Sequence, residues 1–319
     1  MTVPPVRWGI LGTGAINDRF LAGARLTDAA DFVAVGSRTP ERAAVFAERH
    51  GIARVHGSYE ELMADPDVEA IYNALPNTLH HDWTLRALAA GKHVLCEKPY
   101  SRHPAEVDEA FDAADRAGLV LSEAFMWRHH PQVRRLLDSL PAIGALQTIR
   151  ATFSYVQEGA ADIRLRPELD GGSLMDVGCY CVSGSRLIAG EEPDLVYGAA
   201  APGPSGVDVR FTGVLHFPSG LVGEFTSGFT STHHTLEAIG SAGSVMLTNP
   251  WQSQPASIVR DGVETELEAQ NFYRLEVEDV GRAIRGERAP LLGRADALGQ
   301  ARVLDALLRS AETGQPVRL

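Results

Sequence analysis

The chain has 319 residues, a formal net charge of −12 and 45% hydrophobic residues. This length favours two domains, and the negative charge argues against nucleic acid or anionic lipid as a partner, because like charges repel. No apolar run approaches the roughly 20 residues that a membrane-spanning helix requires. We expect no signal peptide, because a strand begins close to the amino terminus. Three cysteines in apolar settings form neither a disulfide framework nor a zinc motif, which predicts a cytoplasmic protein.

Strands and helices alternate through the first 122 residues. Val6 to Leu11 is a short apolar run that predicts a buried strand. Further strands are expected at 32–35, 69–74, 93–96 and 119–122, and helices at 18–25, 40–50, from 59 onward, 81–90 and 104–117. Glycine follows three of these helices at the point where each is expected to end. Alternation of this kind predicts a doubly wound parallel sheet.

The first predicted strand runs into Gly12-Thr13-Gly14-Ala15-Ile16-Asn17. Glycines at a strand-to-helix turn let the backbone approach a pyrophosphate, which then lies at the helix N-terminus. The match to G-x-G-x-x-G is incomplete, because Asn17 stands at the third glycine position. Its place in an alternating α/β pattern nevertheless favours a dinucleotide-binding Rossmann domain. The residues expected at the cofactor are Gly12, Gly14, Ala15 and Ile16.

The end of the second strand indicates which dinucleotide binds. An acidic residue there would bond the ribose 2′-hydroxyl of NAD and repel a 2′-phosphate. This chain instead has Ser37 and Arg38, with no acidic residue before Glu41. A hydroxyl and a guanidinium suit a phosphate, so we predict NADP(H) in preference to NAD(H). An arginine that stacks on adenine, which either cofactor permits, is the alternative interpretation of Arg38.

The chain has only two lysines, Lys92 and Lys98, and both lie in the segment GKHVLCEKP at 91–99. Arginine keeps its proton in proteins, whereas the proton affinity of lysine can be tuned. Ligands of open α/β sheets lie at the carboxyl ends of the strands, and Lys98 follows a predicted strand. The loop LPNTLH at 75–80 follows another. For Lys92, codon bias remains the simpler interpretation.

Three segments resemble the Gfo/Idh/MocA oxidoreductase family: GILGTGAI at 9–16, PNTLH at 76–80 and GKHVLCEKP at 91–99. The resemblance extends over the whole chain and is strongest to the dihydrodiol dehydrogenase and D-xylose dehydrogenase branch. It implies that Lys98 is the active-site lysine and that Glu97 contacts a cofactor ribose. It also implies that Pro76, Asn77 and His80 belong to a loop that lines the nicotinamide end.

A dinucleotide-binding domain is predicted at 1–122, and an α+β domain for substrate binding and oligomerisation at 123–319. In the second domain we expect a helix at 131–140 and a strand at 146–156. The polar loop at 159–169 carries Arg164 and Arg166, and we expect it to be solvated, with a position over the active site as the alternative. After Pro193, short apolar runs separated by turns predict a large, mainly antiparallel open sheet. Helices at 273–285 and 295–312 close the chain.

The motif GGSLMDVGCY at 171–180 opens a helix that is predicted to continue to 189. Asp176 and Tyr180 are four residues apart and share one face, whereas apolar residues take the other faces, so the helix is predicted to be largely buried. A buried carboxylate and a buried phenol need hydrogen-bond partners or a functional role. Spacing alone favours a tyrosine bonded to backbone. The resemblance implies instead that Tyr180 carries the proton, because the dihydrodiol dehydrogenase branch has tyrosine where many members have histidine.

Hydride transfer at a carbon that bears a hydroxyl requires the hydroxyl proton to be removed or supplied. A free tyrosine has a pKa near 10, and a nearby ammonium lowers it. Lys98 would supply that charge from the other domain, and Asp176 would either bond a substrate hydroxyl or orient Lys98.

We therefore expect an NADP-dependent oxidoreductase that acts on a sugar, a polyol or a dihydrodiol, with its site in the cleft between the domains. The resemblance implies a homodimer or homotetramer that assembles through the C-terminal sheet. The first alternative is a non-redox NAD-dependent glycosidase of the same fold. The second is a non-catalytic NADP-binding sensor, which would need none of Lys98, Asp176 and Tyr180.

Overall fold

The computed structural model describes residues 4–159, 162–252 and 255–319. The chain folds into two compact units, Met1–His129 with Asn271–Leu298, and His130–Gln270 with Gly299–Leu319. The sequence places the whole of 123–319 in one domain, whereas the structure groups 123–129 and 271–298 with the first unit. Residues 160–161 of the predicted polar loop lie outside the described residues.

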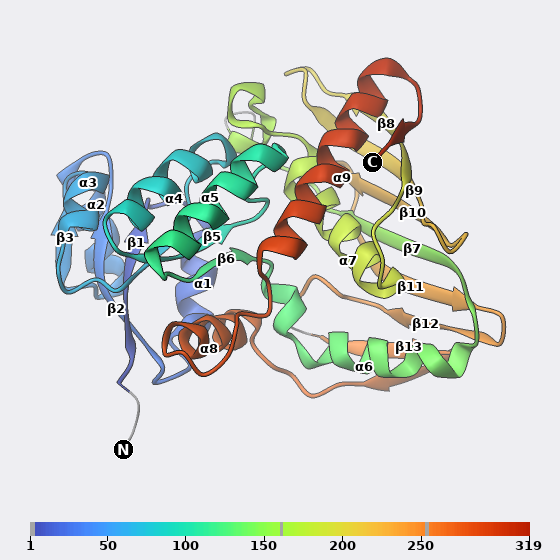
Figure 1. Cartoon of the computed structure of the whole chain (residues 1–319), viewed down its shortest axis with the longest axis horizontal. Helices are drawn as coiled ribbons and strands as arrows, with labels where there is room; N and C mark the ends of the chain where they lie inside the picture. The colour runs from blue at the N-terminus through green and yellow to red at the C-terminus, as the bar shows by residue number, and fades with distance from the viewer. Residues whose placement is uncertain (1–3, 160–161, 253–254) are drawn as a thin grey trace. The chain divides into compact units, whose positions relative to one another are not determined.

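The first unit contains a six-stranded parallel sheet in the order β3-β2-β1-β4-β5-β6 (Figure 1). Its strands are β1 (Val6–Leu11), β2 (Ala30–Gly36), β3 (Arg54–His56), β4 (Ala70–Asn73), β5 (His93–Glu97) and β6 (Leu121–Ala124). This confirms the doubly wound sheet. The sequence missed β3, because its three residues contain no apolar run.

Helices cover both faces of this sheet: α1 (Ile16–Ala24), α2 (Pro40–His50), α3 (Tyr59–Ala64), α4 (His80–Ala89), α5 (Pro104–Ala117) and α8 (Phe272–Ile284), with short turns η1 (Asn77–Leu79) and η2 (Met126–His129). Apolar residues of α1, α2 and α8 join Trp8, Ile10 and Tyr72 in one core cluster. Gly9 faces the other side, where a Cβ would lie 3.0 Å from Leu62 of α3. Figure 1 shows α4 and α5 side by side. Since Val277 and Val280 belong to the core cluster, α8, which the sequence placed in the second domain, completes the core of the first unit.

The second unit contains a nine-stranded sheet in the order β14-β13-β12-β11-β7-β10-β9-β8-β15. Its strands are β7 (Leu146–Ser154), β8 (Leu195–Pro202), β9 (Asp208–His216), β10 (Val222–Gly228), β11 (His233–Gly240), β12 (Gly243–Leu247), β13 (Ser257–Arg260), β14 (Val263–Glu266) and β15 (Val317–Arg318). Neighbours are antiparallel except β7 and β10, which are parallel. The mainly antiparallel sheet is confirmed, and its parallel pair arises because β7 inserts between β10 and β11.

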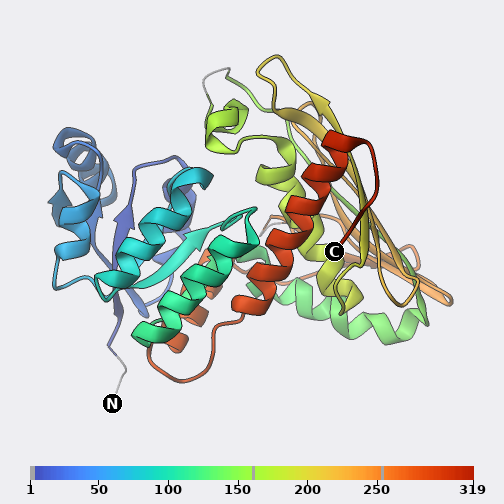
Figure 2. The ribbon, with the colours of Figure 1, turned by 45° about the horizontal axis from the view of Figure 1, so that its top comes forward.

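The helices of this unit are α6 (Pro131–Ser139), η3 (Leu140–Ile143), η4 (Ile163–Leu165), η5 (Pro167–Leu169), η6 (Leu174–Gly178), α7 (Cys179–Ala189) and the part of α9 (Arg294–Thr313) from residue 299 onward. Figure 2 shows α7 along one face of the sheet, against β7, β10 and β11. The segment predicted as one α-helix begins as a π-helix, η6, and almost every residue of α7 is buried, as predicted. Within the described residues no helix has the length and apolar character needed to cross a membrane.

Candidate active site

Two glycines shape the turn between β1 and α1. Gly12 has a φ of +93°, and a Cβ there would lie 2.9 Å from Cδ2 of Leu75, so the fold itself requires glycine. Gly14 is exposed, and its nearest neighbour would be the carbonyl oxygen of Ala74 at 3.7 Å from a Cβ. Packing within the chain therefore does not require glycine at position 14. An open backbone at this point fits the approach of a pyrophosphate.

Asn17, at the third position of the glycine motif, is buried in the first turn of α1. Its side-chain amide donates to the carbonyl oxygens of Gly12 at 3.3 Å and Gly14 at 3.0 Å. Asn17 thus stabilises the turn through side-chain hydrogen bonds, which a glycine at this position could not form. Among the described residues no side chain caps the amino terminus of α1, and such a helix end can accept an anion.

The loop after β2 carries positive charge and no carboxylate. Ser37 is held in place by a bond from its N–H to the carbonyl oxygen of His56 at 3.3 Å, whereas Arg38 is exposed. Burial raises the pKa of Tyr59, and the guanidinium groups of Arg38 and Arg42 oppose that rise, so both charges lie near its phenol. The sequence did not predict Arg42, which lies in the first turn of α2, just after the loop that carries Arg38.

His80 joins the loops that follow β4 and β5. Its buried ring places Nδ1 3.0 Å from the carbonyl oxygen of Pro99 and Nε2 2.8 Å from that of Leu75. Burial lowers the pKa of His80, while the two carbonyl oxygens favour the protonated ring. The amide of Asn73 donates to the carbonyl oxygen of His80 at 3.1 Å. His80 thus ties the two loops together, and Pro76 and Asn77 are half-buried beside it.

The two lysines have different surroundings. Lys92 is only 7% exposed, and its Nζ donates to the carbonyl oxygens of Asp65 and Val68 at 2.8 Å each. This gives Lys92 a structural role that the sequence did not predict. Lys98 is half-buried and directly follows β5. Only the second lysine therefore lies at the carboxyl edge of the parallel sheet.

Glu97 fixes the start of the segment that carries Lys98. One carboxyl oxygen accepts the hydroxyl of Tyr72, and the other accepts the N–H of Lys98 at 3.2 Å. Because β2, β1, β4 and β5 are adjacent and parallel, their carboxyl ends meet at one edge. The residues that the sequence predicts for the cofactor lie at the ends of these strands, in the loops that follow them or at the first residue of the next helix: Gly12, Gly14, Ala15, Ile16, Ser37, Arg38, Pro76, Asn77, His80, Glu97 and Lys98.

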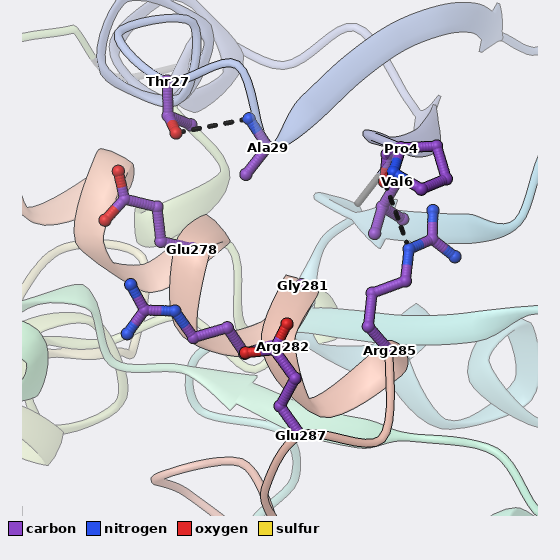
Figure 3. Close-up of a pocket in the computed structure, with 9 residues that line it drawn as sticks. All are labelled: Pro4, Val6, Thr27, Ala29, Glu278, Gly281, Arg282, Arg285 and Glu287. Carbon is purple, nitrogen blue, oxygen red and sulfur yellow. Dashed lines mark hydrogen bonds between the residues drawn. The ribbon is translucent and has the colours of Figure 1, made fainter. Parts of the chain in front are cut away.

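The opposite edge of this sheet carries a pocket of about 260 Å³ (Figure 3). It is lined by residues before β2 and at the start of β1, and by the end of α8, including Arg282 and Arg285. The guanidinium of Arg285 donates hydrogen bonds to the carboxylate of Glu69 at 2.9 Å and to the carbonyl oxygen of Pro5 at 2.8 Å. Ligands of open sheets lie at the carboxyl ends of strands, so this pocket is not the candidate cofactor site.

In the second unit, Asp208 anchors the helix that carries the motif at 171–180. Its Oδ2 accepts the hydroxyl of Ser173 at 2.7 Å and the N–H of Leu174 at 2.8 Å. Gly172 has a φ of +116°, and a Cβ there would lie 2.1 Å from Oδ1 of Asp208, so only glycine fits. Burial raises the pKa of Asp208, and the two bonds oppose that rise. The helix then begins with a π-turn, a feature common at functional sites.

Tyr180 lies in an aromatic cluster. Its side chain is 4% exposed, and its ring meets those of Phe153 and Trp251 at centroid distances of 5.2 and 5.8 Å. Trp251 is held by a bond from its indole N–H to the carbonyl oxygen of Thr152 at 2.9 Å. Packing of this kind leaves the phenol ring few orientations. The sequence missed Phe153 and Trp251, since no local pattern joins them to Tyr180.

Asp176, one helical turn before Tyr180, has two partners from other elements. Its Oδ2 accepts the hydroxyl of Tyr155 at 2.7 Å and pairs with Nε of Arg164 at 3.1 Å. The expectation of an incidental, solvated arginine is thus wrong for Arg164. It holds for Arg166, which is half exposed and pairs with Glu168 at 2.7 Å. In the part of the chain that the structure describes, no group of three His, Cys, Asp or Glu side chains has a metal-binding arrangement.

Comparison with known proteins agrees with this architecture. A model described as the oxidoreductase family with an NAD-binding Rossmann fold matches residues 6–125, and a model of the GFO/IDH/MocA C-terminal domain matches residues 130–246. The chain belongs to the GFO/IDH/MocA oxidoreductase family. Membership makes it an NAD(P)-dependent oxidoreductase, and the predicted family is confirmed.

Named members of this family are similar over nearly the whole chain. D-xylose 1-dehydrogenase (NADP(+)) 2 of Haloferax volcanii is 38% identical over 98% of this chain and 99% of its own length. Trans-1,2-dihydrobenzene-1,2-diol dehydrogenase of Xenopus laevis is 33% identical over 95% of this chain and 97% of its own length. A crystal structure of a 3-ketoreductase from Actinomadura kijaniata in complex with NADP and TDP-benzene is 29% identical, with a TM-score of 0.90 over 96% of this chain and 98% of the other.

Proposed function

We propose that this chain is an NADP-dependent oxidoreductase that transfers hydride between nicotinamide and a CH–OH carbon of a sugar, a polyol or a dihydrodiol. The observation that carries the proposal is the position of Lys98, which directly follows β5 at the same sheet edge as the open turn at Gly14. The names of relatives that oxidise D-xylose or a dihydrodiol support this substrate class.

The carboxyl edge of the first unit fits NADP. The pyrophosphate would lie against Gly14 and the uncapped amino terminus of α1, and the 2′-phosphate against Ser37, Arg38 and Arg42. When bound, NADP supplies the nicotinamide that accepts or delivers the hydride. In this arrangement His80 holds together the two loops at the nicotinamide end, through its contacts with the carbonyl oxygens of Pro99 and Leu75.

The reaction also requires a proton carrier, and Tyr180 takes this role. A free phenol has a pKa near 10, and a positive charge beside it favours the phenolate. Lys98 supplies that charge, so that Tyr180 removes the substrate hydroxyl proton during oxidation and returns it during reduction. The packing of Phe153 and Trp251 limits the directions that the phenol can take. Asp176 belongs to the same site as a polar group that contacts substrate or orients Lys98.

The two units have separate tasks in this proposal. The first binds the dinucleotide, and the second binds substrate and a second copy of the chain. In β9, Phe211 and Leu215 are buried on the side of α7, whereas Val214 is 38% exposed on the other side. An exposed apolar side chain on a wide sheet favours a homodimer or homotetramer through this face.

The experiment that tests the proposal follows nicotinamide absorbance with NADP and with NAD against a panel of aldoses, polyols and arene dihydrodiols. The matching lactones and ketones test the reverse direction. We expect turnover of at least one substrate group, faster with NADP. Tight cofactor binding without turnover across the panel would point to a sensor. Glycoside cleavage without net NADPH formation, on a nucleotide that never exchanges, would point to a glycosidase.

A further inference from the structure

Two side chains of the second unit meet at one carboxyl oxygen of a third. Oδ2 of Asp176 accepts the hydroxyl of Tyr155 at 2.7 Å and pairs with Nε of Arg164 at 3.1 Å. Tyr155 directly follows β7, Arg164 lies in η4, and Asp176 lies in η6. The Asp176 side chain is 14% exposed and the Arg164 side chain 37% exposed, so the carboxylate is largely shielded from water whereas the guanidinium reaches solvent. Contacts to a shielded carboxylate are stronger than those at a solvated surface.

Arg164 is held in place by its backbone as well as by its side chain. Its carbonyl oxygen accepts the N–H of Gly172 at 2.8 Å, and a Cβ at Gly171 would lie 2.5 Å from the same oxygen. The Arg164 N–H and Nη1 both bond Oδ1 of Asp162, at 2.9 and 3.2 Å. The η4 turn is therefore closed onto the start of the helix that carries Asp176. This explains why the motif begins with two glycines.

Charge and hydrogen bonding indicate the same protonation states for Asp176, Tyr155 and Arg164. The carboxylate of Asp176 is the largest cause that raises the pKa of Arg164, and Tyr155, whose pKa is raised first by burial and then by Asp176, keeps its proton. Tyr155 therefore donates its hydroxyl to Asp176, and Arg164 forms an ion pair with the same carboxylate. A carboxylate that accepts one hydroxyl and pairs with a guanidinium has a defined direction, and its oxygens have lone pairs that can accept a further hydroxyl.

We propose that Tyr155 and Arg164 are positioning residues that hold Asp176 as the acceptor for a second hydroxyl of the substrate, next to the hydroxyl that is oxidised. This inference rests on the proposed function, in which Tyr180, one helical turn further on, takes the proton of the reacting hydroxyl. It selects substrate binding over the orientation of Lys98 as the task of Asp176.

The test is a double-mutant cycle with NADP and D-xylose as probes. We expect Tyr155→Phe and Arg164→Leu each to raise KM for D-xylose about tenfold, the loss expected for a hydrogen bond to a charged group. The dissociation constant of NADP should change less than about twofold, and Arg164→Lys should recover part of the loss. In an Asp176→Asn background neither substitution should raise KM further, because both act through that carboxylate.

Arg166→Leu is the matched control, since Arg166 lies two residues away and pairs only at the surface. It should leave KM unchanged. Thermal unfolding of each variant identifies any that fail to fold, and Tyr155→Phe removes a single oxygen and keeps the packing. An unchanged KM in Tyr155→Phe and in a folded Arg164→Leu, or an equal rise in KM with and without Asp176, would overturn the inference.

The positioning role of Tyr155 and Arg164 can be tested even if the proposed oxidation of D-xylose is not observed. If the wild-type chain binds D-xylose but does not oxidise it, the same cycle is read from the calorimetric dissociation constant of D-xylose for the NADP-loaded protein. A tenfold weakening that disappears in Asp176→Asn would then still support the positioning role. Binding that is equal in all variants, or absent from the wild type, would overturn it.

Discussion

At the scale of single residues, identical side chains have different roles because of what surrounds them. Lys92 donates to two carbonyl oxygens and is buried, whereas Lys98 is half-buried at the carboxyl end of β5. Arg164 pairs with Asp176 at 3.1 Å, whereas Arg166 pairs with Glu168 at the surface. In each pair the functional candidate is the side chain that the fold brings to a strand end or to a half-buried carboxylate.

Tyr180→Phe removes one oxygen and leaves the aromatic packing with Phe153 and Trp251 in place. We expect turnover to fall by about 10²- to 10⁴-fold, the usual contribution of a general acid or base, with NADP binding nearly unchanged. Steady-state kinetics and a cofactor titration measure the two effects. Tyr197→Phe, at an exposed position of β8, is the matched control. Near-normal turnover in Tyr180→Phe would remove the phenol from the mechanism.

Arg38→Ala tests the choice of cofactor. Loss of a guanidinium that meets the 2′-phosphate should weaken NADP binding about 10- to 100-fold and leave NAD binding almost unaffected, because NAD lacks that phosphate. Arg134→Ala, at an arginine that pairs with Asp138 on the surface of α6, should change neither affinity. Equal losses for both cofactors would instead indicate that Arg38 stacks on adenine.

At the scale of elements, α8 carries a buried acid that the proposed reaction does not use. Glu276 is fully buried, and neither of its carboxyl oxygens has a hydrogen-bond partner among the described residues. Burial raises the pKa of Glu276 well above its usual range, and the carboxylates of Glu97 and Asp279 raise it further. The folded chain therefore keeps this carboxyl protonated at pH values where the unfolded chain has lost the proton.

Glu276→Gln should stabilise the protein increasingly as the pH rises. Below the pKa of the unfolded carboxyl, near 4.3, both states hold the proton and pH has no effect through this group. Above it, the wild type loses about 1.4 kcal/mol of unfolding free energy per pH unit relative to the glutamine variant. Urea unfolding between about pH 5 and about pH 8 measures the difference. Glu278→Gln, whose carboxylate pairs with Arg274, should show no such gain. A constant difference across this range would mean that Glu276 is ionised in the folded chain.

At the scale of the whole molecule, the chain passes between its two units three times, after residues 129, 270 and 298. The segment 271–298 supplies α8, whose Val277 and Val280 belong to the core of the first unit. It also supplies the carbonyl oxygen of Leu292, which accepts the hydroxyl of Ser122 at 3.0 Å. The Rossmann unit is thus incomplete without a segment that follows almost all of the second sheet in sequence.

A fragment of residues 1–122 should therefore unfold without cooperativity or aggregate, because one side of its core is exposed. Residues 1–129 joined by a flexible linker to 271–298 should fold and bind NADP. Circular dichroism during heating, together with a cofactor titration, compares the two fragments. Equal cooperativity and equal NADP affinity would show that α8 is dispensable to the first unit.

Features that depend on near neighbours along the chain were predictable from the sequence. Apolar runs, helix periodicity and glycine stops predict the alternating elements of the first unit, because each reflects local backbone preference and one buried face. The glycine turn at 12–17 and the lysine after β5 indicate a cofactor edge for the same reason, since parallel strands bring their carboxyl ends together.

Features that depend on residues far apart in the chain were not predictable in this way and arise from folding. Folding inserted β7 between β10 and β11 and placed α8 on the first unit. It also brought Tyr155 and Arg164 to Asp176. No local pattern distinguishes an arginine in water from one beside a half-buried carboxylate. The difference arises from which distant groups are desolvated together, and that depends on the packing of the complete fold.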